Sequence, residues 1–126
     1  MMINRMVLNR IIGVLLLSMI FAACIGPKAG VAPESVTPGT IDEANARWAG
    51  TSASDLEAGR AVMAERCSRC HAFPNVVRED EQEWPGIMEK MAKKAKLDSL
   101  QKEQVTHFII AWRADMIARG TNNEAE

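Results

Sequence analysis

The sequence has little of several features that would identify a protein class at once. Its formal net charge is −1 over 126 residues, so no excess of positive charge suggests nucleic acid as a partner. No segment has the pattern of a β-strand, and no internal repeat is visible. With 3 cysteines and 2 histidines, the chain offers few ligands for a structural zinc ion. What remains is an ordinary globular composition and room for one small domain.

The N-terminal residues have the pattern of an export signal. Two arginines precede an apolar run, residues 11–23, that ends in small side chains before Cys24. This run is shorter than the roughly 20 apolar residues of a membrane span. Residues 21–24 resemble a lipobox, in which the cysteine carries diacylglycerol after cleavage, although Phe21 stands where leucine is usual. We expect a lipoprotein signal peptide at 1–23 and lipidation of Cys24, with an ordinary signal peptide as the alternative.

Composition divides the rest of the chain into a linker, a domain and a tail. Residues 24–53 are rich in Gly, Pro, Ala, Ser and Thr and are predicted to be a flexible linker behind the lipid anchor, spanning about 30 Å r.m.s.. Residues 54–119 show helical periodicity and are expected to form the domain, followed by a disordered tail at 120–126. A domain of about 65 residues buries little core by itself and usually needs a covalent or metal staple.

Three helices are predicted in this domain, so the expected fold class is all-α. The first opens with Ser54 as N-cap and Glu57 closing a capping box, and it ends at the cysteines. The second covers about residues 81–95, and its start stays open because Pro85 and an acidic capping pattern compete for the first turn. The third has Asp98 or Ser99 as cap and stops at a Gly-Thr-Asn-Asn turn. It is expected to bury four side chains: Val105, Phe108, Ile109 and Trp112.

The motif Cys67-Ser68-Arg69-Cys70-His71 carries the strongest chemical signal. Two thiols at this spacing can add across the two vinyl groups of a porphyrin, and the adjacent imidazole then reaches the iron from the same side. A thioredoxin-like redox pair needs a parallel sheet, and no strands are predicted. A structural zinc ion needs two more ligands, and no second CxxC is present. We therefore expect one covalent haem c, held by Cys67 and Cys70 and ligated by His71.

The surroundings of this motif resemble the mono-haem class I c-type cytochrome family. In that family the first helix carries a glycine, an apolar or aromatic residue four positions later, and the first haem cysteine four positions later again; Gly59, Met63 and Cys67 keep this spacing. The glycine lets the C-terminal helix cross closely, with an aromatic residue at the crossing, and Trp112 stands where tyrosine is usual. The resemblance covers roughly residues 54–116. It implies a small three- to four-helix cytochrome c fold wrapped around one covalent haem.

The resemblance also implies a methionine as the sixth iron ligand. Short cytochromes of this type have a tryptophan and, seven residues later, the ligand methionine, and Trp84 and Met91 fit this pattern. Met88, on the same stripe of the helix, is the alternative, and an open sixth site is another. Met91 follows His71 by only 20 residues, which departs from the usual layout of the family. Histidine and methionine ligation raises the reduction potential and suits electron transfer.

Three further features have both a functional and a structural interpretation. His107 would make a bis-histidine site, but it points away from the apolar face of its helix, so we expect a surface histidine. A carbonyl near Pro74 could accept a hydrogen bond from Nδ1 of His71 and orient the ring, or the proline could mark a simple turn. Four lysines could dock an acidic partner, but they lie mainly opposite the apolar stripe, where a solvated face is expected: Lys90, Lys93, Lys94 and Lys96.

Together these patterns predict an exported electron-transfer protein rather than an enzyme, since no acid, base or second metal can be assigned to catalysis. Its single haem would pass electrons between a redox-protein donor and acceptor at the periplasmic side of a bacterial membrane. The residue after the lipidated cysteine is Ile25 and not aspartate, which favours sorting of the lipoprotein to the outer membrane. The alternatives are a haem-based sensor or small-ligand-binding protein, and a haem subunit of a membrane-associated oxidoreductase complex. Neither nucleic acid nor a small-molecule substrate is expected.

Overall fold

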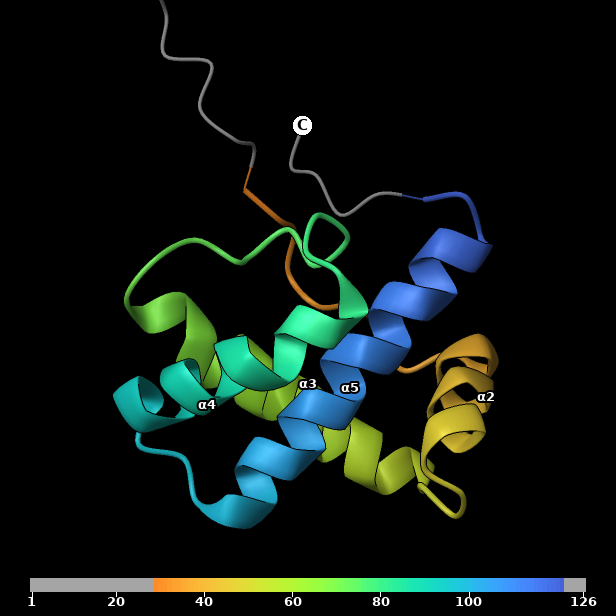
Figure 1. The fold of residues 1–126 in the computed structure, drawn as a ribbon, viewed down its shortest axis with the longest axis horizontal. Coiled ribbons are helices and arrows are strands. Elements are labelled where there is room, and N and C mark those ends of the chain that lie inside the picture. Colours follow the sequence, from red (N-terminus) through yellow and green to blue (C-terminus); the bar gives the residue numbers. More distant parts are fainter. Residues whose placement is uncertain (1–28, 122–126) are drawn as a thin grey trace, which may run out of the picture.

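The computed structural model describes residues 29–121, which form an all-helical structure without strands (Figure 1). The all-α fold class is therefore confirmed for this part of the chain. The predicted signal peptide, Cys24 and residues 122–126 of the predicted tail lie outside the described residues. Four α-helices are joined by short 3-10 turns, in the order α2 (Pro38–Arg47), α3 (Ala53–Arg66), η2 (Cys67–Arg69), η3 (Glu81–Glu83), α4 (Trp84–Ala95) and α5 (Ser99–Ala118). None of the helices between residues 29 and 121 is both long and apolar enough to cross a membrane.

Helix α5 forms the centre of the fold. It packs most extensively against α3 and α2, and less extensively against α4; Figure 1 shows it between these helices. All four α5 side chains that the sequence predicted to be buried are buried: Val105, Phe108, Ile109 and Trp112. The core also takes in Leu56 and Met63 from α3 and Trp84 and Met88 from α4. Helices α3 and α4 thus share one apolar cluster with α5.

The helix starts agree with the sequence in one case and differ in another. Asp98 caps α5 as predicted, with its Oδ1 accepting from the Gln101 amide at 2.8 Å. The prediction of Ser54 as the cap of α3 was wrong, because Ser52 has the extended backbone of an N-cap and its Oγ accepts from the Asp55 amide at 3.1 Å. Ser54 lies inside the first turn.

The open start of the second predicted helix has a simple explanation in the structure. Both competing signals are used, one after the other. Glu83 accepts a hydrogen bond from the Asp80 amide at 3.1 Å and closes the turn η3. Pro85 then occupies the first turn of α4, where its missing N–H leaves no hydrogen bond unmade.

Helix α2 is the main difference from the sequence prediction. Residues 38–47 lie within the range 24–53, for which a flexible linker was predicted, and that prediction was wrong for this segment. Thr37 caps the helix, with its Oγ1 accepting from the Thr40 amide at 3.0 Å. The sequence contained the cap and a proline in the first turn, and a short apolar stripe: Ala44 is buried in the core, and Ile41 and Trp48 pack against it.

The attachment of α2 to α5 has a polar part as well as an apolar one. Asp115 of α5 is only 5% exposed, and its Oδ2 accepts from the hydroxyls of Thr37 at 2.8 Å and Thr40 at 3.1 Å. Gly39 lies so close to Asp115 that any side chain there would collide with the carboxylate. Hydrogen bonds to a buried carboxylate are among the stronger ones in proteins, and they add to the apolar contacts of α2.

Candidate functional site

A cavity of about 240 Å³ lies between the end of α3, the loop that follows it, and α4. All residues that the sequence singled out for a haem site line this one cavity: Cys67, Cys70, His71, Met88 and Met91. They come from two separate segments of the chain. The structure therefore brings together groups that the sequence analysis connected only by chemistry and resemblance.

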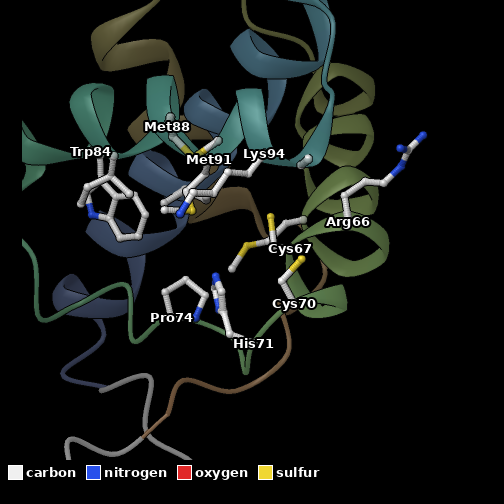
Figure 2. Close-up of a pocket in the computed structure, with 13 residues that line it drawn as sticks. Arg66, Cys67, Cys70, His71, Pro74, Trp84, Met88, Met91 and Lys94 are labelled. Carbon is white, nitrogen blue, oxygen red and sulfur yellow. The ribbon is translucent and has the colours of Figure 1, made fainter.

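These groups occupy different sides of the cavity (Figure 2). His71 lies on one side, and Met88 and Met91 of α4 lie on the opposite side. The two cysteines stand at one end and Trp84 at the other. A flat ligand attached to the cysteines would thus have the imidazole on one face and a methionine on the other.

The helix α3 and the turn η2 place the two cysteines. Cys67 is the C-cap of α3, with its amide bonded to the Met63 carbonyl, and the 3-10 turn brings Cys70 to the mouth of the cavity. Cys67 is half-buried and Cys70 is exposed. Burial raises the pKa of the Cys67 thiol, whereas reactive dithiols have a lowered pKa at one cysteine. This electrostatic setting does not favour a thioredoxin-like redox pair.

A backbone carbonyl orients His71. Nδ1 lies 2.6 Å from the carbonyl oxygen of Ala72, so Nδ1 carries the proton and Nε2 keeps a free lone pair for a metal. The sequence analysis expected such a carbonyl near Pro74, and the acceptor is found two residues earlier. Pro74 itself lines the cavity.

The two methionines of α4 differ in their surroundings. Met88 is 3% exposed and belongs to the apolar core. Met91 is half-buried and lines the cavity without belonging to that core. Met88 therefore has a packing role whatever the cavity holds, while Met91 has a more accessible thioether.

Trp84 presents a buried polar atom without a partner. The residue is 2% exposed, and its indole Nε1 has no hydrogen-bond acceptor among the described residues. A buried donor without a partner costs about 1–3 kcal/mol. Trp112 also has an unpaired Nε1, but it does not line the cavity.

Two basic residues, Arg66 and Lys94, line the cavity. The sequence analysis did not single out Arg66, and it expected Lys94 on the solvated face of its helix. Lys94 follows Met91 by three residues and so lies near it on α4, which was the available signal. The solvated-face interpretation fits the exposed residues Lys90, Lys93 and Lys96, and Lys93 pairs with a neighbouring Glu89 at 3.3 Å.

His107 lies outside the cavity, as the sequence analysis expected. Its ring stacks on that of Trp48, with centroids 3.8 Å apart, and both line a separate hollow between the turn that follows α2, the first turn of α3 and α5. Burial lowers the pKa of His107. The stack, together with packing against the core, accounts for the position of Trp48.

The donor set of the cavity fits a haem. It offers two thiols from the CxxC motif, an imidazole with a free Nε2 and a thioether opposite, within largely apolar walls. Among residues 29–121 no three His, Cys, Asp or Glu side chains cluster as ligands for a bare metal ion.

Comparisons with known proteins add no family assignment. No family model matches the chain, and no match is found among curated proteins or solved structures. The interpretation of the cavity rests on the residues that line it.

Proposed function

We propose that this protein is an exported, lipid-anchored electron-transfer protein with one covalent haem c, similar to the class I cytochromes. The observation that carries the proposal is the convergence of the CxxCH motif and the α4 methionines on one apolar cavity. Cys67 and Cys70 would form the thioethers and His71 the proximal iron bond. Met91 would be the distal ligand, with Met88 as the alternative.

Each residue then has a separate task. The thioethers fix the position of the macrocycle, and the Ala72 carbonyl fixes the tautomer and the direction of His71. Met91 would supply the second protein ligand to the iron, and Met63, Met88 and Ile109 line the cavity with apolar side chains that exclude water. When bound, the haem iron would supply one-electron chemistry between the ferric and ferrous states. With both iron ligands supplied by the protein, no site for a small-molecule substrate is needed.

The proposed setting is the periplasmic side of a bacterial membrane. Cys24 would carry the lipid, and redox proteins would be the donor and acceptor. These assignments depend on the export pattern in the sequence, whose residues lie outside the described part of the chain.

The three cysteines allow a direct test. The full chain is produced in a host that attaches c-type haem and processes lipoproteins, and its mass and optical spectrum are measured. We expect a red protein with the added mass of one haem. Cys67→Ser combined with Cys70→Ser should abolish covalent haem and keep the lipid, whereas Cys24→Ser should keep the haem and abolish lipid and membrane association. A colourless wild-type protein of bare polypeptide mass plus lipid would contradict the proposal.

A further inference from the structure

The chain in front of α2 is attached to the domain instead of hanging free. We call residues 30–37 the strap; they lead to α2 without forming a helix. The Gly30 amide donates to the Phe73 carbonyl oxygen at 2.8 Å, and both Gly30 and Pro33 are buried. Phe73 follows His71 by two residues, so the first contact of the strap is with the loop that carries the proposed iron ligand.

Further along, the strap is bound to two helices. The Val36 amide donates to Glu57 of α3 at 3.1 Å, and Glu34 pairs with Arg119 of α5 at 3.0 Å. Thr37 then joins the buried carboxylate of α5 described above. Figure 1 shows the strap, in orange, running between the green loop and the C-terminal end of α5. Contacts to three separate elements hold it in one path across the domain.

This attachment shortens the tether between lipid and domain. Gly30 follows Cys24 by only six positions, so the chain between the two residues can span at most about 20 Å even when fully extended. A domain of this size is roughly 30 Å across. The far side of the domain is therefore out of reach of the membrane surface, and the side where the strap begins must stay near it. A flexible linker over residues 24–53 would impose no such limit.

The tethered side is the side of the proposed haem loop. Figure 2 shows the orange-brown strap passing below His71 and Cys70, and the hydrogen bond from Gly30 to Phe73 places it against that loop. Cys70 and His71 are exposed there. We infer that the strap holds the haem loop against the membrane surface, and that the electron partner is a membrane-bound redox protein whose redox centre lies at that surface.

This inference rests on the proposed function, including the lipid on Cys24. The exchange it describes moves one electron between the haem iron and the partner's centre and requires no proton or other reactant. Because electron transfer slows steeply with distance, a short tether favours partners at the membrane over partners in solution.

Two matched insertions test the strap in the full lipidated protein. About 20 Gly and Ser residues are inserted between Lys28 and Ala29, ahead of the strap, or between Ala49 and Gly50, in the exposed turn after α2, where insertions are tolerated best. The reduced proteins are placed on phospholipid vesicles that contain a lipid with a ferrocenium headgroup, which takes one electron from the ferrous iron. Ferricyanide serves as the soluble oxidant.

We expect the first insertion to slow oxidation by the ferrocenium lipid about threefold or more, and the second to leave it unchanged. Oxidation by ferricyanide should be equal in all three proteins. With a flexible linker over 24–53, both insertions would slow the reaction equally. Equal effects, or no effect of the first insertion, would overturn the inference.

Amide hydrogen exchange supplies a readout that does not depend on electron transfer. The Gly30 and Val36 amides should exchange at least about 100-fold more slowly than in an unstructured peptide, and rates close to the peptide values would overturn the inference. A colourless protein with protected strap amides would refute the proposed function alone. A red protein with unprotected strap amides would refute the strap alone.

Discussion

Gly59 of α3 lies directly against the backbone of Gln104 in α5. A Cβ added to Gly59 would come within 2.6 Å of the Gln104 carbonyl carbon and 3.0 Å of the Phe108 Cβ. Neither backbone can move without separating the two helices at the centre of the fold. This is the close helix crossing that the resemblance to class I cytochromes implied for this glycine, and Phe108, stacked on Trp112 with ring centroids 5.5 Å apart, lies beside it.

Gly59→Ala should therefore lower the free energy of unfolding by about 3 kcal/mol, since overpacking here displaces backbone and not a flexible side chain. Gly86→Ala is the matched control, because Gly86 is also helical but a Cβ there meets no atom within 4 Å. It should raise stability by less than about 1 kcal/mol through the gain in helix propensity. Urea unfolding of the two variants checks this, and equal effects would show that the crossing is not tight.

The two α4 methionines should respond differently in the haem-loaded protein. Met91→Ala should abolish the ferric methionine-sulfur charge-transfer band and let carbon monoxide bind promptly to the reduced protein. Met88→Ala should keep the band while lowering the free energy of unfolding by about 2–4 kcal/mol, because Met88 is buried in the core. The opposite spectra would assign the distal ligand to Met88. Prompt carbon monoxide binding by the wild type would favour the sensor alternative.

The ion pair between α2 and η3 should make stability depend on pH. Nε and Nη2 of Arg47 donate to the two carboxylate oxygens of Glu81, each at 2.7 Å, and these hydrogen bonds hold the pKa of Glu81 below its ordinary value. Because the folded pKa is the lower one, the stabilisation is complete above the unfolded pKa near 4.3 and is lost as pH falls through the folded pKa.

Glu81→Gln should thus cost about 1 kcal/mol or less at neutral pH, since both side chains are partly exposed, and almost nothing near pH 3. Urea unfolding at both values measures the difference. Glu79→Gln is the control, because no ion pair links the Glu79 side chain to any described residue, and it should behave as wild type at both pH values. A loss for Glu81→Gln that grows on acidification would contradict the assigned sign.

The sequence by itself determined the elements whose signals are local. Apolar periodicity predicted the core face of α5 because a helix presents every third or fourth residue to the same side. Asp98 was recognised as a cap because its partner amide lies three residues away. The CxxCH motif is likewise local, because its two cysteines and its histidine lie within five residues, and the proposed haem attachment depends on that spacing.

The tertiary structure alone decided how these parts meet. It selected Ser52 over Ser54 as the cap of α3, since both satisfy the sequence pattern and only the backbone differs. It placed Lys94 at the cavity. Above all, it attached α2 and the strap through hydrogen bonds to partners far along the chain, 78 residues apart for Thr37 and Asp115. A polar contact across such a separation leaves no periodic trace in the sequence, because its energy depends on one pair of atoms and not on a repeated face.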